Sequence, residues 1–250
     1  MADSKRVAAW VIVAGMAVDG AAFAAHPLQT EDTGTQGTGN VEFENGLLRS
    51  RAGASKTFVY QPQLSYGASP TLDLIVQPSW LTNRDEGSAT VRGWGDTNLD
   101  AKWRFFGAAP LSFALRAGAT LATNQRGLGL RHGEVSAHAL LVATFDAAPF
   151  TLHGNLGLSR NPNGTAGRTW VRRVSAALMW AADERLTLTV DGGTESNPDP
   201  ARGPWPATLL VGAIYTIRPG LDVDIGYQSS VRAAVPTREW LVGLTYRFAP

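Results

Sequence analysis

The 250-residue sequence contains no cysteine and no long helical pattern. Without cysteine the chain has no disulfides, no thiolate metal ligands and no cysteine nucleophile, and it is compatible with an oxidising compartment. Charge is also scarce, since 17% of the residues are charged and the formal net charge is +1. This balance gives no argument for binding nucleic acid or an acidic partner. Composition therefore leaves the function open, and nothing in it indicates a cofactor.

Residues 1–24 have the three parts of a secretory signal peptide. Lys5 and Arg6 form a positive start, residues 7–18 form an apolar core, and residues 22–24 read Ala-Phe-Ala, a small-x-small cleavage pattern. The apolar run is too short for a transmembrane anchor, and Asp19 interrupts it. The sequence therefore predicts export.

Residues 25–39 are polar and rich in glycine and show no periodicity. We expect a periplasmic lead-in, or a segment tucked into the mouth of a barrel. A sharper hypothesis makes His26 a metal ligand, with Asp32 six residues later. One histidine and one acid in a segment of this kind fall short of the ligands that a metal site needs, so we predict no metal.

The stretch 92–106 carries the clearest structural pattern. Its apolar positions Leu99, Ala101, Trp103 and Phe105 alternate with the polar positions Asn98, Asp100, Lys102 and Arg104. Such period-2 alternation is typical of a strand with one apolar and one polar face. Aromatic residues stand at both ends, about ten residues apart, which is the length of a tilted strand that crosses a bilayer. The polar face would then line a lumen.

Twelve alternating segments follow one another from residue 40 to the end of the chain. Tight turns rich in Pro and Gly are expected at 67–70, 107–110, 146–149, 181–184 and 218–220, and longer polar loops near 48–56, 82–93, 123–132, 160–169, 194–205 and 229–238. A soluble β-sandwich would not explain why aromatic residues collect at the strand ends. The sequence predicts an all-β fold, a membrane-spanning antiparallel up-and-down barrel of about 12 strands over residues 40–250, whose first and last strands pair.

Two motifs resemble a known family. They are residues 26–39, His-Pro-Leu-Gln-Thr-Glu-Asp-Thr-Gly-Thr-Gln-Gly-Thr-Gly, followed by 41–44, and residues 93–105, Gly-Trp-Gly-Asp-Thr-Asn-Leu-Asp-Ala-Lys-Trp-Arg-Phe. They resemble outer-membrane transporters of the phenol-degradation meta-pathway type. The resemblance implies an outer-membrane barrel that passes small, often hydrophobic or aromatic molecules, and it carries over no catalytic residue.

The inward-facing rows combine charged and apolar side chains. The lumen-lining candidates are Asp73, Asp100, Lys102, Arg104, Arg116, Glu134, His138, His153, Arg173, Asp191, Asp222, Asp224, Glu239 and Arg247. Such a lumen would bind amphipathic or aromatic solutes weakly enough to release them. Alternatively, the charges pair with one another and plug a narrow barrel, which then acts as a structural or loop-binding protein. The expected partners are outer-membrane lipid, a small-molecule solute and the barrel-assembly machinery.

A lipid-modifying barrel enzyme is a further alternative. It would need a Ser/His pair on the lipid-facing wall, but no outward row carries a histidine and no Gly-x-Ser-x-Gly elbow occurs. We therefore expect no catalytic activity. A tight turn at 107–110 that places Phe105 opposite Leu111 predicts that Asp100 lies directly opposite Arg116, Lys102 opposite Ala114 and Arg104 opposite Ser112.

Overall fold

The computed structural model describes residues 26–124, 128–130, 134–160, 162, 168–197 and 205–248. The expected signal peptide at residues 1–24 lies outside the described residues. Within them, no helix is long and apolar enough to cross a membrane.

The described chain is built from β-strands. Their bounds are β1 (Val41–Ala52), β2 (Ser55–Ser69), β3 (Leu72–Gln77), β4 (Trp80–Arg84), β5 (Val91–Trp94), β6 (Thr97–Ala108), β7 (Leu111–Leu121), β8 (Val135–Ala147), β9 (Phe150–Arg160), β10 (Trp170–Ala181), β11 (Leu186–Glu195), β12 (Ala207–Arg218), β13 (Leu221–Arg232) and β14 (Thr237–Phe248). β3 and β4 both pair with β2, and they are two parts of one strand interrupted at residues 78–79. β5 and β6 continue one another in the same way, so the fourteen segments make twelve strands.

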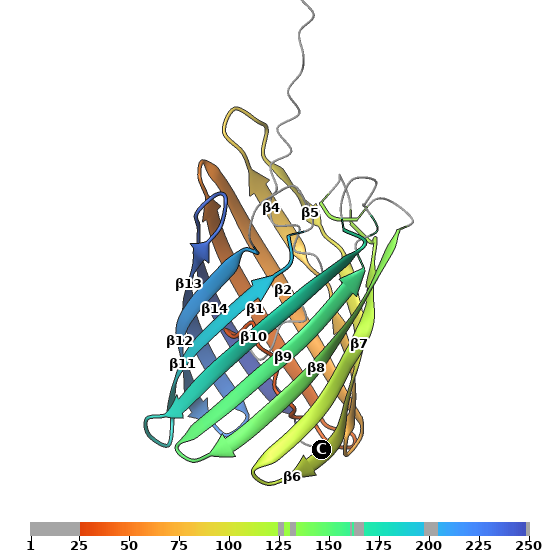
Figure 1. The fold of residues 1–250 in the computed structure, drawn as a ribbon, viewed down its shortest axis with the longest axis vertical. Helices are drawn as coiled ribbons and strands as arrows, with labels where there is room; N and C mark the ends of the chain where they lie inside the picture. The colour runs from red at the N-terminus through yellow and green to blue at the C-terminus, as the bar shows by residue number, and fades with distance from the viewer. Residues whose placement is uncertain are drawn as a thin grey trace, which may run out of the picture.

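All strands pair antiparallel with their neighbours and close into one barrel (Figure 1). β1 pairs with β14 over its whole length, from Val41 opposite Phe248 to Ala52 opposite Thr237. Closure leaves no open sheet edge, so the backbone N–H and C=O groups of the wall bond to one another. The prediction of a closed barrel of about 12 strands is confirmed.

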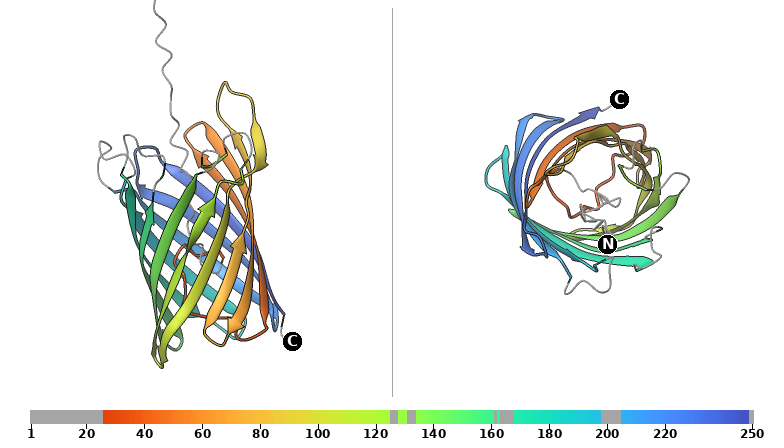
Figure 2. Two further views of the ribbon diagram at one scale, coloured as in Figure 1. Left: turned by 90° about the vertical axis from the view of Figure 1, so that its right-hand side faces the viewer. Right: turned by 90° about the horizontal axis from the view of Figure 1, so that it is seen from above.

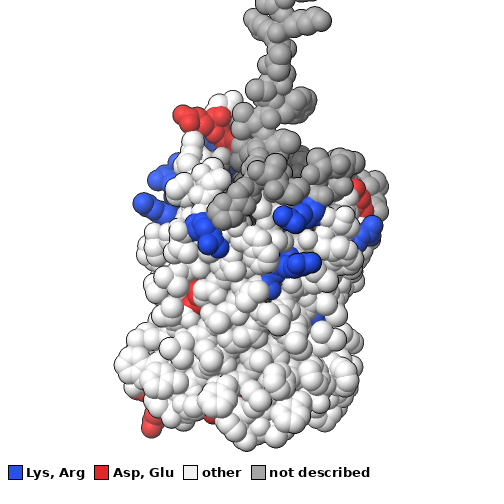
Figure 3. All heavy atoms as spheres, in the orientation of Figure 1, with Lys and Arg blue, Asp and Glu red and all other residues white. Residues whose placement is uncertain are grey.

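The two faces of the wall follow the alternation in the sequence. In β6, Leu99 and Trp103 are exposed on the outside, whereas Asp100 and Lys102 are buried inside. In the space-filling view, the lower part of the outer surface is almost free of charge (Figure 3). Aromatic side chains stand at both strand ends, such as Phe145 and Trp180 at one end and Trp170 and Trp240 at the other. An apolar outer band between two aromatic girdles is what a bilayer requires.

The connections differ between the two ends of the barrel. Short turns join the strands at one end, called here the short-turn end, and longer connections cross the other, the long-loop end (Figure 1). The prediction of a long loop near residues 48–56 is wrong, because β1 and β2 continue to a two-residue connection. This connection contains Gly53, whose φ is +59°. Its polar composition reflects strand ends that reach beyond the apolar band, not a loop. The loop expected at 229–238 also shortens to residues 233–236.

Residues 26–40, called here the inner segment, lie inside the barrel. Viewed along the barrel, the segment runs within the ring of strands and joins β1 at the short-turn end (Figure 2). Its side chains contact the inward faces of strands on all sides of the lumen, so this segment decides what the lumen can do.

Candidate functional site: the barrel lumen

The first residues of the inner segment dock against β10 to β13. The His26 imidazole Nδ1 lies 2.6 Å from Asp224 Oδ1. Leu28 packs on Ala177 and Met179. The Asp191 carboxylate then accepts three hydrogen bonds, from the Gln29 and Thr30 N–H groups and from the Thr30 hydroxyl, at 2.6, 2.8 and 2.7 Å. The inward acids of these strands therefore hold the segment.

Glu31 is the centre of the largest ionic cluster. Its carboxylate lies 3.0 Å from Lys102 Nζ and 2.5 Å from Arg116 Nη1. Its backbone exchanges two hydrogen bonds with the Asn155 side chain, at 2.7 and 2.9 Å. Because these groups are buried, their desolvation has to be offset by complete pairing, and removing one partner leaves a buried charge uncompensated. The cluster joins the inner segment to β6, β7 and β9 at one point.

Asp100 and Arg116 also belong to this cluster. Arg116 donates to Asp100 Oδ2 from Nε at 2.9 Å and from Nη2 at 2.7 Å. His138 Nε2 lies 2.6 Å from the other Asp100 oxygen. Arg116 is fully buried, and its guanidinium links two carboxylates, those of Asp100 and Glu31.

The expected register of β6 on β7 is wrong. Lys102, not Asp100, lies directly opposite Arg116, and Asp100 faces Gly118. Arg104 lies opposite Ala114 instead of Ser112. The strands continue beyond Phe105 to a turn between Ala108 and Leu111, and a bulge between Arg104 and Phe106 changes the register again. Asp100 and Arg116 still bond because the long Arg side chain reaches the diagonal neighbour across the pair.

The last part of the inner segment lies at the short-turn end. The Gln36 N–H donates to both oxygens of the Asp73 carboxylate at 3.1 Å, and its side-chain amide donates to Glu42 at 2.7 Å. Thr33 meets Thr144 and Ser112. The segment thus crosses the lumen from β13 to β3 and fills its short-turn half with hydrogen-bonded contacts.

Glycines on the inner wall make room for the segment. A Cβ at Gly226 would lie 2.9 Å from Pro27 Cβ, and one at Gly46 would lie 2.8 Å from His26 Cδ2. Gly67 leaves space in the same way for the backbone of Gly37. These close approaches explain why inward positions carry glycine where the segment touches the wall.

The other lumen candidates lie at different places on the inner wall. His153 bonds to Thr144 and approaches the Met179 sulfur, Arg247 pairs with Glu42 and Asp222, Glu239 accepts from Gln228, and Arg173 pairs with Glu195. Arg104 donates to the Pro70 carbonyl at the short-turn end, whereas Glu134 directly precedes β8 at the long-loop end. Of the candidates, the structure brings Asp100, Lys102, Arg116 and His138 together around Glu31, and it separately pairs Arg247 with Asp222. Within the described residues, no group of His, Asp and Glu forms a candidate metal site.

The inner wall of the long-loop half is different. Val59, Leu81 and Leu128 are buried together there, with Leu48 and Val91 packed against them. Leu128 comes from the connection between β7 and β8, and the neighbouring Leu130 N–H is held by Asp96 Oδ2 at 2.6 Å. We call these five side chains the mouth cluster. They form one apolar patch on the inner wall of the long-loop half, packed against the connection between β7 and β8.

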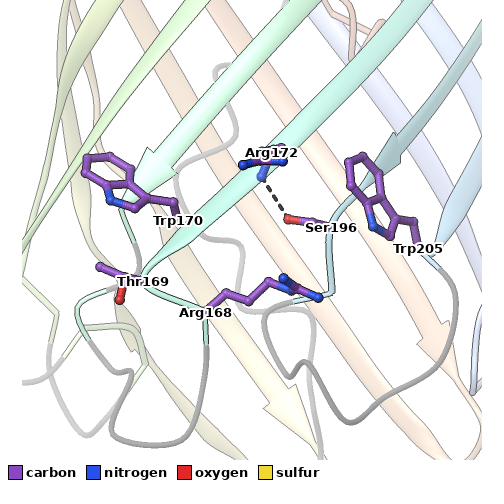
Figure 4. Close-up of a pocket in the computed structure, with 6 residues that line it drawn as sticks. All are labelled: Arg168, Thr169, Trp170, Arg172, Ser196 and Trp205. Atoms are coloured by element: carbon purple, nitrogen blue, oxygen red, sulfur yellow. Dashed lines mark hydrogen bonds between the residues drawn. The ribbon is translucent and has the colours of Figure 1, made fainter.

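A small rim pocket lies at the long-loop end of β10. It has a volume of about 280 Å³ and is lined by Arg168, Thr169, Trp170, Arg172, Ser196 and Trp205 (Figure 4). The Arg172 N–H donates to Ser196 Oγ at 2.9 Å. Trp170 and Arg172 are exposed on the outside of the wall, because the intervening Val171 is buried. This pocket is therefore separate from the lumen.

Sequence reasoning missed Glu31 as a lumen residue. It stands in a stretch without periodicity, so no alternation marked its direction. The available signal was a stretch of polar residues next to a barrel whose inward rows carry both unpaired charges and glycines. Asn155 and Gln63, which also contact the cluster, stand at inward positions of alternating strands and were missed for a different reason, because their side chains are uncharged.

Comparison with known proteins gives the class first. An outer membrane channel from Pseudomonas putida F1 superposes with a TM-score of 0.65 at 12% identity, covering 87% of this chain and 98% of that chain. The NanC porin gives 0.61 at 9% identity, covering 81% and 98%, and the CymD monoaromatic hydrocarbon channel gives 0.55 at 8% identity, covering 86% and 89%. These likenesses show the fold of channel-forming β-barrels.

The family follows from the sequence itself. Residues 24–248 match the model of the family described as "Putative MetA-pathway of phenol degradation". The chain belongs to this family, as the two motifs predicted. No curated protein matches the chain.

Proposed function

We propose that this protein is a passive outer-membrane channel for small hydrophobic or aromatic molecules. The observation that carries the proposal is the mouth cluster. The cluster places the apolar side chains of Val59, Leu81 and Leu128 together on the inner wall at the long-loop end, where a solute from outside would enter. An apolar wall there binds an apolar solute weakly and lets it pass on.

The membership of the chain in a phenol-degradation family supports this proposal. The likeness to a protein named a monoaromatic hydrocarbon channel agrees with it at the level of the fold. The apolar outer band and the two aromatic girdles support placement in an outer membrane, with the short turns on the periplasmic side and the long loops outside.

The inner segment is then the constriction of the channel. It fills the short-turn half through contacts with Asp191, Asn155 and Asp73, so a solute that enters at the mouth meets the segment next. The described histidines His26, His138 and His153 all lie inside the barrel, in contacts with other inward groups. This arrangement supports transport rather than lipid hydrolysis, which needs its histidine on the outer wall.

A plugged structural barrel is the second candidate. The observation that favours it is the ionic cluster around Glu31, in which Arg116 is completely buried. A segment held so firmly would close the lumen permanently. The two candidates differ in whether solute passes through the unaltered protein.

Proteoliposomes that contain the refolded barrel test the proposal. We expect entry of phenol, a small aromatic solute, to be faster than in protein-free vesicles and faster than entry of glycerol. The double substitution Val59→Asn and Leu81→Asn should slow phenol several-fold and leave glycerol unchanged, because it replaces apolar wall by amide.

The matched control is Ser136→Asn, which adds an amide at an inward position that is already polar. Ser136 lies in β8, also at the long-loop end of the barrel. It should leave both rates unchanged. Phenol entry no faster than in empty vesicles, in a preparation shown to be folded, would overturn the channel and support the plugged barrel.

A further inference from the structure

The outer wall carries a row of cations at the long-loop end. Arg238 lies directly opposite Arg51, Arg51 lies opposite Lys56, and Lys56 lies opposite Arg84. The row crosses the neighbouring strands β14, β1, β2 and β4, and at roughly 4.8 Å per strand it is about 15 Å long. We call these four residues the basic row.

The basic row points outward. Arg238 is two residues from the outward Trp240, Lys56 is two from the outward Phe58, and all four side chains are exposed. Arg49, which lies between Trp240 and Phe58, and Arg92 of β5 add two more outward cations just below the row. The same register that places the aromatic girdle thus places the cations directly beyond it.

The row has no partner within the described part of the chain. None of these six cations makes an ion pair or a side-chain hydrogen bond there. No outward-facing strand position in the described residues is Asp or Glu. The acids nearest in sequence are Glu239, which follows Arg238 but points inward, and Asp85 and Glu86 in the connection that follows β4. Like charges directly opposite one another destabilise a sheet. An arrangement of this kind is stable when anions come from outside the protein.

The depth of the row identifies the anion. Arg51 is two residues, or roughly 7 Å along the strand, beyond Arg49, which is paired with Trp240 of the girdle. Aromatic girdles lie at the boundary of the hydrocarbon, and the headgroup layer extends about 5–8 Å farther out. The cations therefore stand at the level of lipid headgroups, in the leaflet on the long-loop side.

We propose that the basic row is a binding site for the phosphate groups of a phosphorylated lipid in that leaflet. Arg presents a planar fork that matches phosphate oxygens, and three of the four residues are Arg. The acyl chains would lie along the outward side chains below the row, among them Phe58, Leu47 and Val242, which are exposed next to one another. The proposal rests on the membrane placement in the proposed function but not on which solute passes the lumen.

The opposite face of the barrel shows a similar distribution. In Figure 3, Lys and Arg gather just below the long loops, while the surface beneath them is almost uncharged. Arg172, beside Trp170 in the rim pocket, is an exposed outward cation at the long-loop end of β10. The basic row differs because its four members are direct cross-strand neighbours, and it is therefore the place where one headgroup meets several cations at once.

Binding of diphosphorylated lipid A by the refolded full-length barrel in detergent tests the proposal, with dephosphorylated lipid A and inorganic phosphate as further probes. We expect diphosphorylated lipid A to bind and to remain bound during detergent exchange. The variant Arg51→Gln with Arg238→Gln should bind on the order of tenfold more weakly or worse, since each cation near an anionic surface adds to affinity. Dephosphorylated lipid A should bind the unaltered protein as weakly as diphosphorylated lipid A binds the variant.

The control is Arg185→Gln with Arg218→Gln, which removes the same charge at the short-turn end and should leave binding unchanged. Heat-modifiable gel migration verifies that both variants are folded. Equal binding by both variants, or equal binding of phosphorylated and dephosphorylated lipid, would overturn the site. Inorganic phosphate that binds as tightly as the lipid would overturn the lipid as its occupant. Phenol entry measured on the same variants separates this outcome from failure of the channel, because the row lies outside the lumen.

Discussion

Two parts of the lumen wall, the ionic contacts of the inner segment and the mouth cluster, are built by the same kind of alternating strand but differ in chemistry. At the short-turn half, inward Asp, Lys, Arg and Gly hold the inner segment through hydrogen bonds and ion pairs. At the long-loop half, inward Leu and Val form the mouth cluster. The period-2 alternation fixes only which side chains point inward. What the lumen does depends on which residue types fill those positions along the strand.

The largest effect is expected at the ionic cluster in the short-turn half. Glu31→Ala leaves Lys102 and Arg116 without their shared carboxylate, which costs about 3–5 kcal/mol of docking free energy for the inner segment. Because the chain has no native cysteine, Thr33→Cys gives a single reporter site. A water-soluble maleimide should label it much faster in the Glu31→Ala background. An unchanged labelling rate would show that the cluster does not hold the segment.

On the outer wall, the stability cost of a substitution should depend on contact with lipid and not on the chemistry of the lumen behind it. Leu115 and Leu141 are paired and both face outward, so replacing either with Arg should cost about 2–4 kcal/mol of barrel stability, measured by urea titration in lipid vesicles. Ser136→Arg, inward at the mouth, should cost less. If the inward and outward substitutions cost the same, the assignment of the faces fails.

A smaller effect should come from the glycines of the short-turn half. Gly226→Ala places a Cβ 2.9 Å from Pro27 and should weaken docking of the segment by about 1–3 kcal/mol through overpacking. Gly154→Ala is the control, because a Cβ there meets nothing within 4 Å. Maleimide labelling at position 33 reports both. Equal labelling of the two variants would mean that the wall glycines do not serve the segment.

The smallest effect is expected at Asp32, the acid that follows Glu31 in the inner segment. Asp32 lies 3.8 Å from Lys102 Nζ, and its side chain is 33% exposed, whereas the Glu31 side chain is 4% exposed. Asp32→Asn should therefore change docking by about 1 kcal/mol or less, the usual range for a weak exposed pair. The same labelling assay applies. An effect as large as that of Glu31→Ala would refute the ranking by burial.

Much of the fold follows from sequence, for physical reasons. Alternation sets the two faces of each strand, and the need to leave no edge in lipid sets the pairing of the first and last strands, so β1 pairs with β14 as expected. The register of β6 on β7 did not follow. The strands run on to a turn between Ala108 and Leu111, so Phe105 does not lie opposite Leu111. A bulge between Arg104 and Phe106 then shifts the pairing by one residue, and the composition gives no local sign of it.

The polar strand ends beyond the membrane were also difficult to recognise. Arg49, Arg51 and Lys56 resemble a loop in composition, yet they continue a ladder that is hydrogen-bonded to β14 and β4. Outside the apolar band, a strand no longer needs apolar side chains on its outer face, and the pattern that reveals it disappears.

The contacts of the inner segment lie beyond sequence reasoning of this kind. His26 and Asp224 are 198 positions apart, and Thr30 and Asp191 are 161 apart. No periodic pattern connects such pairs, and their geometry exists only once the wall has curved into a ring. The separate charges of the lumen could be named from the alternation, but the cluster that joins Asp100, Lys102 and Arg116 needed Glu31 from the segment.

The same separations set an order on assembly. The inner segment is the first described part of the chain, but its partners are supplied by β3, β6, β7, β9, β11 and β13, and the last of these arrives almost at the end of the chain. Contacts this distant form late, after the cost of closing the intervening loops has been met. The contacts of Gln36 with Glu42 and Asp73 can form early, but the segment is fully docked only after β13 has joined the wall. A fully docked segment therefore indicates that the strands from β3 to β13 have assembled around it.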